Sequence, residues 1–210
     1  MSVADRSPAL NVAEAGVASD RARAETTLEL DPDAAFAFVS EIERLFRLNP
    51  HLEIESWQAT SAGFHLLALN ETNECRTDTA ARIDIVPQAR RLVVAYESGL
   101  KRTTSIHVEP NPDGTGSRLV VEENYPAIED PEDPRVAEVD RSLIPWVGAI
   151  RRHLLHRTKW GRLPGWHWWN ERFMPRLPPK QRRIVRLLVW ASVIEFVVFL
   201  ALVAVLVAAK

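Results

Sequence analysis

Three polar residues on predicted strands have side chains that could carry out acid–base chemistry. His107 ionises near neutral pH, so its side chain can both accept and donate a proton. Tyr96 and Glu123 could assist His107 in proton transfer on an enol or a polyketide-like substrate. The alternative is a structural or surface role, which is the commoner one for a lone histidine on a strand. No spacing ties the three residues together, so we predict no catalytic residue and keep His107, Tyr96 and Glu123 as candidates only.

Two further histidines and the single cysteine do not form a metal or nucleophile motif. His153 and His156 lie about one helical turn apart, but the surrounding sequence RRHLLHR is basic and offers no further ligand. Cys75 excludes an internal disulfide, and we expect it to be buried as a small apolar residue. The sequence contains no glycine-rich phosphate loop, zinc motif or nucleophile elbow. It therefore predicts no metal site and no cofactor.

The elements that would position these side chains follow one another in a simple order. A strand expected over residues 22–30 precedes Asp31-Pro32-Asp33, which provides an N-cap, a first-turn proline and an acid for a helix over residues 34–48. Six further strands are expected over residues 51–59, 64–70, 75–86, 91–97, 101–109 and 117–125. No helix separates these six strands, so we expect them to pair antiparallel. A long amphipathic helix follows over residues 136–160, with a kink at Pro145.

This order of elements resembles a known superfamily. The segments that carry the resemblance are ARAETTLELDPDAAFAFVSEIERLFRLNP and EVDRSLIPWVGAIRRHLL. They are similar to the START-like helix-grip proteins, also called SRPBCC or polyketide cyclase/dehydrase-like proteins. The resemblance implies an α+β helix-grip fold, in which a curved antiparallel sheet of about seven strands wraps around a long C-terminal helix. It also implies a cavity between sheet and helix for a sterol, lipid, quinone or polyketide-like ligand.

Side chains that alternate along the expected strands define the inner face of the sheet. They mix small, apolar and hydroxyl-bearing residues, which suits a cavity with an apolar wall and a few fixed polar contacts. The alternative is that the same residues fill a closed core. The expected ligand-cavity residues are Thr77, Thr79, Ala81, Ile83, Val94, Tyr96, Ser105, His107, Val121, Tyr125, Leu143 and Val147.

An apolar run near the C-terminus predicts a transmembrane helix. Residues 187–209 read LLVWASVIEFVVFLALVAVLVAA and contain one charged residue, Glu195. At about 1.5 Å of rise per residue, this helix reaches about 34 Å and can cross a hydrocarbon core of about 30 Å. We therefore expect a single-pass C-terminal anchor. A carboxylate is costly inside a bilayer, so we expect Glu195 either to be protonated and face lipid or to contact a helix of a homodimer or membrane-protein partner.

A basic segment rich in aromatic residues precedes the apolar run and indicates the orientation of the anchor. Residues 151–186 contain eleven Lys or Arg residues and one acid, whereas residues 1–150 carry 14 basic and 26 acidic residues. Positive residues beside a membrane span favour the cytoplasmic side, and tryptophan favours the headgroup region. Such a composition could also bind single-stranded nucleic acid, which we reject beside a transmembrane helix. The expected membrane-interface residues are Trp160, Trp166, Trp168, Trp169, Phe173, Arg182 and Arg183, with Trp166, Trp169 and Phe173 on one face of a turn pair that lies flat on the membrane.

The expected organisation has four parts. They are a disordered segment over residues 1–21, a START-like domain over 22–160, a juxtamembrane collar over 161–186 and a transmembrane helix over 187–209. The N-terminal residues lack the basic and apolar regions of a secretory signal, so we expect a cytoplasmic domain, at a bacterial inner membrane.

We expect the protein to bind or present a hydrophobic small molecule at the cytoplasmic leaflet. A cyclase or aromatase acting on a membrane-associated precursor is one alternative. A ligand-free scaffold that recruits a membrane enzyme is another. The expected partners are membrane lipids and the hydrophobic ligand, with no nucleic acid.

Overall fold

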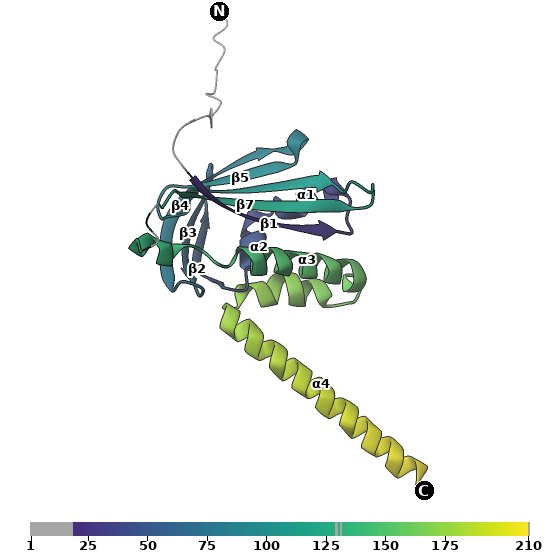
Figure 1. Ribbon diagram of the computed structural model, residues 1–210. Coiled ribbons are helices and arrows are strands. Elements are labelled where there is room, and N and C mark those ends of the chain that lie inside the picture. Colours follow the sequence, from purple (N-terminus) through teal and green to yellow (C-terminus); the bar gives the residue numbers. More distant parts are fainter. Residues whose placement is uncertain (1–18, 129, 131, 210) are drawn as a thin grey trace, which may run out of the picture.

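One antiparallel sheet of seven strands lies at the centre of the described part of the chain. The computed structural model describes residues 19–128, 130 and 132–209, and Figure 1 shows its elements. The strands lie in the order β1-β7-β6-β5-β4-β3-β2, so the first strand pairs with the last. Their bounds are β1 Ser19–Leu28, β2 Leu52–Ala59, β3 Gly63–Asn70, β4 Cys75–Val86, β5 Arg91–Tyr96, β6 Thr103–Pro110 and β7 Ser117–Pro126. The predicted antiparallel series is confirmed.

The first strand begins earlier than predicted. β1 includes Ser19–Arg21, which we expected to belong to a disordered segment over residues 1–21. These residues pair with the end of β7, at Pro126, Tyr125 and Asn124. The remainder of that segment lies outside the described residues.

The helix predicted over residues 34–48 is divided into two short helices. Their bounds are α1 Pro32–Val39 and α2 Ile42–Arg47. Asp31 caps α1 as predicted, since its carboxylate accepts a hydrogen bond from the backbone N–H of Asp33 at 2.9 Å. The first helix ends at Ser40, whose hydroxyl donates to the carbonyl of Phe36 at 2.8 Å. A serine side chain that bonds locally to the backbone competes with continuation of a helix, so the chain can turn and start α2 in a new direction.

The long helix under the sheet begins later than predicted. Its bounds are α3 Leu143–Trp160, and a short 3-10 helix, η2 Pro134–Glu138, precedes it. The prediction of one kinked helix over residues 136–160 is therefore wrong. Pro145 lies in the first turn of α3, where its missing N–H leaves no helical hydrogen bond unmade. The indole N–H of Trp146 donates to the carbonyl of Leu45 at 2.9 Å and ties α3 to α2.

The core lies between the inner face of the sheet and the helices α1, α2 and α3 (Figure 1). α1 packs against β6 and β7, α2 against β2, and α3 against β1. Side chains alternate along each strand, so that Phe64, Leu66 and Ala68 of β3 are buried while the residues between them are more exposed. From α3, Val147 and Ile150 are buried in the same core.

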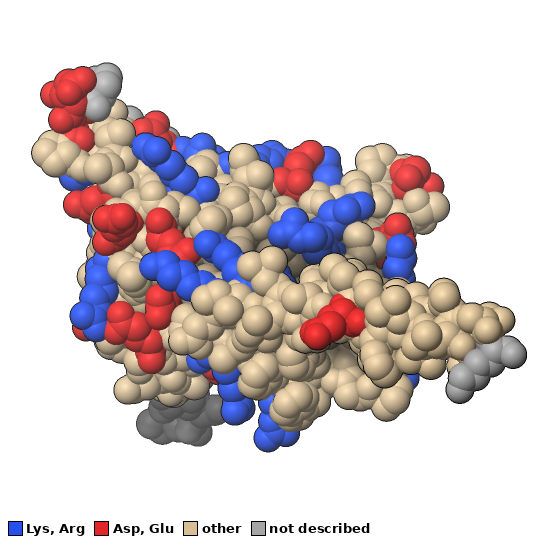
Figure 2. Space-filling view, turned by 90° about the horizontal axis from the view of Figure 1, so that it is seen from below, with Lys and Arg blue, Asp and Glu red and all other residues tan. Residues whose placement is uncertain are grey.

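A further long helix projects from the domain (Figure 1). After the short turns η3 Trp168–Phe173 and η4 Met174–Arg176, α4 runs over Pro179–Ala208. It is long and apolar enough to span a membrane, and its apolar stretch is fully exposed. Seen from below in Figure 2, its surface is apolar with one acidic interruption, and Glu195 is the acid of this helix. Apart from the corrected start of the domain in β1, the boundaries of the four predicted parts stay predictions.

Candidate functional site

A cavity of about 400 Å³ lies between the sheet and the helices α2 and α3. This volume falls in the range of about 300–1,000 Å³ that is usual for small-molecule sites. One wall is apolar and is formed by Phe46, Leu52, Leu66, Ala68 and Trp146. The cavity thus has room for a ligand and a surface that an apolar ligand can contact.

The cavity opens to solvent at one side. Its exposed lining residues come from the start of β4, from the turn between β5 and β6, and from η2. They are Arg76, Asp78, Ser98, Gly99 and Glu138. A ligand can therefore reach the apolar wall past a polar rim.

A group of charged side chains, which we call the Lys101 cluster, lies at this cavity and consists of Lys101, Glu123, Tyr125 and Asp140. The Nζ atom of Lys101 lies 2.6 Å from Oδ2 of Asp140 and also donates to Oε1 of Glu123. The hydroxyl of Tyr125 donates to Oε2 of Glu123 at 2.7 Å. Glu123 has no exposed side-chain surface, and Asp140 is 11% exposed. Two carboxylates therefore share one ammonium group away from bulk water.

Four segments bring the Lys101 cluster together. Glu123 and Tyr125 are two residues apart on β7, so they point to the same face of the sheet. Lys101 lies just before β6, which pairs with β7. Asp140 lies between η2 and α3, where its Oδ1 accepts a hydrogen bond from the backbone N–H of Ser142 at 2.7 Å. The side chain of Asn73, from the loop after β3, donates to the carbonyl of Glu138 at 2.6 Å and holds this segment beside the cavity.

The protonation states of the Lys101 cluster follow from its contacts. Burial opposes the charged form of Lys101, but the charges of Glu123 and Asp140 outweigh burial and hold the pKa of Lys101 well above its ordinary value. Burial likewise opposes the charged form of Asp140, but the charge and hydrogen bond of Lys101 lower its pKa to about 2. Burial raises the pKa of Tyr96 to about 12 and also raises the pKa of Tyr125, so both phenols are neutral.

The predicted cavity residues divide into three groups. Thr77, Thr79, Tyr96 and Tyr125 line the cavity. Ala81, Val94, Val121, Leu143 and Val147 are buried in the core beside it, and Ile83 packs against that core. The prediction is wrong for Ser105 and His107, because they lie on the opposite face of β6 from the core residues Ile106 and Val108.

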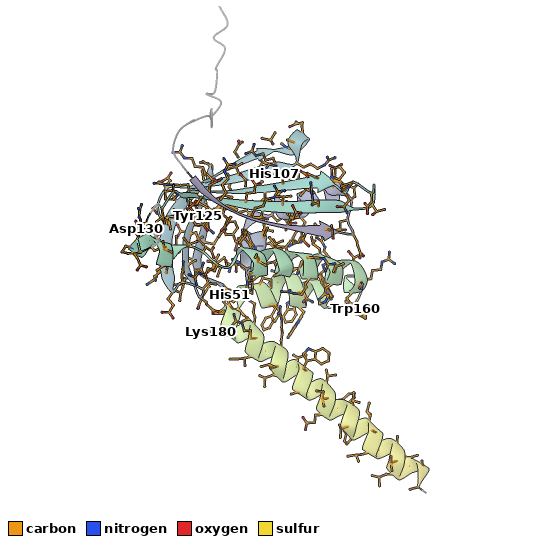
Figure 3. All side chains as sticks on the ribbon, in the orientation of Figure 1. His51, His107, Tyr125, Asp130, Trp160 and Lys180 are labelled. Carbon is orange, nitrogen blue, oxygen red and sulfur yellow. The ribbon has the colours of Figure 1, made fainter. Side chains whose placement is uncertain are left out.

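The structure separates His107 from the other two candidate residues for acid–base chemistry, Tyr96 and Glu123. His107 pairs with Arg91 and Val120 in the sheet, and Figure 3 shows it apart from Tyr125. Partial burial, together with the charge of Arg91, lowers the pKa of His107. The hydroxyl of Tyr96 lies 3.0 Å from that of Thr104, on the inner face. Glu123 belongs to the Lys101 cluster, so the arrangement that we considered as an alternative, His107 acting with Tyr96 or Glu123, is not present.

Sequence reasoning missed Lys101 and Asp140. Lysine is rare in this chain, with four lysines against 22 arginines, and this was the one signal that could have singled out Lys101. Asp140 lies in a segment that we predicted to be helical, which concealed its role. The two residues are 39 positions apart, and only the tertiary structure joins them.

His153 and His156 take different positions on α3. The ring of His153 stacks on Phe38 with 5.5 Å between ring centroids, and burial lowers its pKa to about 4. His156 is exposed. Within residues 19–128, 130 and 132–209, no three potential metal ligands come together.

The aromatic collar packs partly against the domain. Trp166, Trp169 and Phe173, which we expected to face the membrane, are half-buried, and Trp166 lies 5.7 Å from the ring of His153. Of the tryptophans predicted at the membrane interface, Trp160 of α3 and Trp168 of the collar are exposed, at 53% and 58%. The turn pair expected to lie flat on the membrane thus presents a different face from the one predicted.

Ion pairs hold the collar in this position. Glu171 lies 3.4 Å from Arg157 of α3 and 3.7 Å from Arg44 of α2. The base of α4 is fixed as well, because Arg182 donates to the carbonyl of Arg47 at 2.7 Å and Arg183 to that of Pro50 at 3.0 Å. Figure 3 shows the neighbouring residues His51 and Lys180 at this junction.

Several solved structures share the fold of about two thirds of this chain. The Zhui aromatase/cyclase from Streptomyces sp. R1128 matches with a TM-score of 0.54 and 12% identity, over 69% of this chain and 99% of that chain. Norcoclaurine synthase of Thalictrum flavum, solved as a point mutant with a transition-state analogue, matches with a TM-score of 0.52 and 15% identity, over 69% and 99%. The chain has a START-like helix-grip fold.

A third helix-grip neighbour contains two domains. The di-domain ARO/CYC protein BexL, from the BE-7585A biosynthetic pathway, matches with a TM-score of 0.51 and 17% identity, over 66% of this chain and 47% of that chain. No protein-family model and no curated protein sequence matches the chain. At these identities the neighbours establish the helix-grip fold, and function has to be argued from the site itself.

Proposed function

We propose that this protein binds a hydrophobic small molecule in its cavity and exchanges it with the cytoplasmic leaflet of a membrane, to which α4 anchors the domain. The observation that carries the proposal is the cavity of about 400 Å³, with its apolar wall, in a chain that also has an exposed apolar helix of membrane-spanning length. Keeping an apolar ligand beside a bilayer avoids a transit through water, which costs about 0.8 kcal/mol per CH₂ group.

The junction between the domain and α4 supports this exchange. Arg183 at the start of α4 donates to the carbonyl of Pro50 and to the carboxylate of Glu71, each at 3.0 Å. Pro50 lies between the cavity-lining residues Asn49 and Leu52, and Glu71 follows Asn70, which also lines the cavity. The helix that would enter the bilayer is therefore fixed to segments that form the cavity.

The charge distribution supports the cytoplasmic orientation. Arg182, Arg183 and Arg186 lie in the part of α4 that precedes its apolar stretch, where positive residues favour the cytoplasmic side. With this orientation, the exposed rings of Trp160 and Trp168 are candidates for contact with lipid headgroups. A bacterial inner membrane is the proposed location.

Mass spectrometry of the ligand that copurifies with the detergent-extracted full chain tests ligand binding. Thr77→Trp should fill the cavity and remove that ligand, because Thr77 lines it. Ala80→Trp is the matched control, since Ala80 lies on the opposite face of β4 from Thr77 and Thr79 and does not line the cavity. No copurifying ligand in the wild-type protein, or equal retention in both variants, would contradict the proposal and favour the ligand-free scaffold.

Truncation after Arg186 tests the anchor while keeping the contacts of Arg182 and Arg183 with the domain. We expect the truncated protein in the soluble fraction, whereas full retention on membranes in high salt would show that α4 is not the main attachment. Protease added outside intact cells should leave the domain uncut. Cleavage there would reverse the proposed orientation.

The Lys101 cluster favours a second candidate function, acid–base catalysis of the cyclase type on a membrane-associated precursor. Asp140 lines the cavity and can accept a proton, and Lys101 and Tyr125 of the same lining carry groups that can donate one. Incubating the purified protein with a polyketide-type precursor and following product by mass spectrometry tests this candidate. Turnover that is lost in Asp140→Asn with ligand retention unchanged would support catalysis, and no turnover in the wild-type protein would reject it.

A further inference from the structure

We propose that the cavity selects apolar ligands whose head group is an amine or a hydroxyl, and that it discriminates against carboxylates and phosphates. This inference rests on the proposed function, because it names the chemical class of ligand for the same cavity. The geometry that carries it is the position of Lys101 between Glu123 and Asp140, with Tyr125 beside them.

The Lys101 cluster has an excess of one negative charge. Glu123 receives hydrogen bonds from two donors, the ammonium of Lys101 and the hydroxyl of Tyr125, and this is the bonding of an ionised carboxylate. Asp140 also receives two, from Lys101 and from the backbone N–H of Ser142. The Lys101 cluster therefore contains one cation and two anions, and one of the anions, Glu123, has no exposed side-chain surface.

The other charged residues at the cavity add no unpaired positive charge to its described lining. Arg76 and Asp78 are exposed on the face of β4 opposite to Thr77 and Thr79, where they lie beside Glu55 and His65, so their charged groups point away from the cavity. Lys101 is the remaining basic residue of the lining, and Glu138 adds a carboxylate at the exposed rim. Among the described lining residues, an entering anion would therefore meet no cation that is free of a carboxylate partner.

Asp140, the carboxylate of the Lys101 cluster that lines the cavity, retains capacity to accept hydrogen bonds. A carboxylate offers about four lone-pair positions, and Asp140 accepts one bond from Lys101 at Oδ2 and one from the backbone N–H of Ser142 at Oδ1. A hydroxyl or ammonium head group can donate to the remaining positions. A carboxylate or phosphate head group would instead compete for Lys101 with two carboxylates that already hold it, and like charges at close range disfavour binding.

A set of three probes with one apolar scaffold tests this selectivity. Naphthylmethylamine, naphthylmethanol and naphthoate differ in their head group, and near neutral pH the first is a cation, the second is neutral and the third is an anion. Binding to the full chain in nanodiscs of a zwitterionic phospholipid is measured by calorimetry, with empty nanodiscs as the control for partition into lipid. We expect the amine and the alcohol to bind more tightly than naphthoate, and the amine to exceed naphthoate by about tenfold or more.

Removal of one carboxylate should reduce the discrimination. Asp140→Asn makes the Lys101 cluster neutral, so the ratio of amine to naphthoate affinity should fall by about tenfold. Asp84→Asn is the matched control, because Asp84 is exposed on β4 and does not line the cavity, and it should leave the ratio unchanged. If Asp140→Asn does not fold, Glu123→Gln makes the same change of charge and replaces it. The ratio of amine to naphthoate affinity in the wild-type protein also tests the head-group selectivity without any variant.

The outcomes separate this inference from the proposed function. Naphthoate binding as tightly as the amine, or an equal effect of Asp84→Asn, overturns the head-group selectivity and leaves ligand binding standing. Absence of binding by all three probes, together with no copurifying ligand, overturns the proposed function and this inference with it.

Discussion

Lys101 gives the most direct test of the Lys101 cluster, because its ammonium group separates two carboxylates with little access to water. Lys101→Met removes the charge and keeps an unbranched apolar stem. Both carboxylates then lose their cation in a place with little water, since the side chain of Glu123 has no exposed surface and that of Asp140 is 11% exposed. Breaking a buried ion pair from one side costs about 3–5 kcal/mol, since the remaining charge has no partner. We therefore expect Lys101→Met to lower the free energy of unfolding by about 3–5 kcal/mol.

The pH dependence of stability should also change sign in this variant. In the wild-type protein, Lys101 overcomes the effect of burial and lowers the pKa of Asp140 from 3.8 to about 2. A carboxyl whose folded pKa is depressed stabilises the fold above its unfolded pKa, so about 2 kcal/mol should be lost as the pH falls from about 4 to about 2. In Lys101→Met, Asp140 loses the charge that lowers its pKa while burial still favours its protonated form, so stability should rise on mild acidification toward the unfolded pKa of about 4.

Thermal unfolding of the full chain in detergent micelles, followed by near-ultraviolet circular dichroism of its tryptophans, measures both effects. A loss of this size should lower Tm by about 10 °C at neutral pH. Lys159→Met is the control, because Lys159 is exposed in the last turn of α3, and its Tm should change little. A Tm for Lys101→Met close to that of Lys159→Met, with no gain on mild acidification, would refute the reasoning about the Lys101 cluster.

Two other groups give independent predictions. Burial lowers the pKa of His153 to about 4, so the unfolded chain binds a proton more readily than the folded one, and the free energy of unfolding should fall as the pH falls from about 6.5 to about 4. His153→Phe should therefore raise the free energy of unfolding at pH 5 by about 2 kcal/mol, as measured by denaturant titration. An unchanged dependence of stability on acid pH in this variant would contradict the prediction. We propose that Glu195 contacts a second α4 helix or a membrane-protein partner. In a Cys75→Ala background, crosslinking from Ser192→Cys should exceed that from Val193→Cys and weaken when Glu195→Leu is added, because such contacts contribute about 0.6–2 kcal/mol. Equal crosslinking from both positions, unaffected by Glu195→Leu, would leave Glu195 as a lone protonated carboxyl.

Local features of the sequence were sufficient for the strands, for the cap at Asp31 and for the existence of α4. The period of two along residues 64–70 and 75–86 reflects one buried and one exposed face, and each strand shows it without reference to its neighbours. Asp31 caps a helix through hydrogen bonds to residues two and three positions away. The apolar length of residues 187–209 is likewise a property of a single segment. The antiparallel series and the resemblance to helix-grip proteins followed from the order of these elements.

The errors in secondary structure arose where two local preferences competed. Ser40 lies within a continuous apolar pattern, yet α1 ends at Val39 and α2 begins at Ile42. Pro145 could either bend a helix or begin one, and the contacts of Asp140 and Ser142 with other segments decide that α3 begins there. The apolar pattern along the chain looks the same whether a helix continues through such a residue or begins or ends there.

The site itself depended on contacts between distant segments. Alternation shows that Ser105 and His107 share a face with each other, but which face meets the core depends on the pairing of β6 with β5 and β7. Thr77, Thr79 and Ala81 share one face of β4, yet Thr77 and Thr79 line the cavity and Ala81 is buried in the core. The Lys101 cluster joins positions 101, 123, 125 and 140, and its chemistry arises because burial removes the water that would otherwise screen these charges. Short-range properties along the chain were enough to predict the strands and the apolar segment that is long enough for a membrane. Which polar groups are buried together could be seen only in the folded chain, since burial and contact depend on segments that are far apart in the sequence.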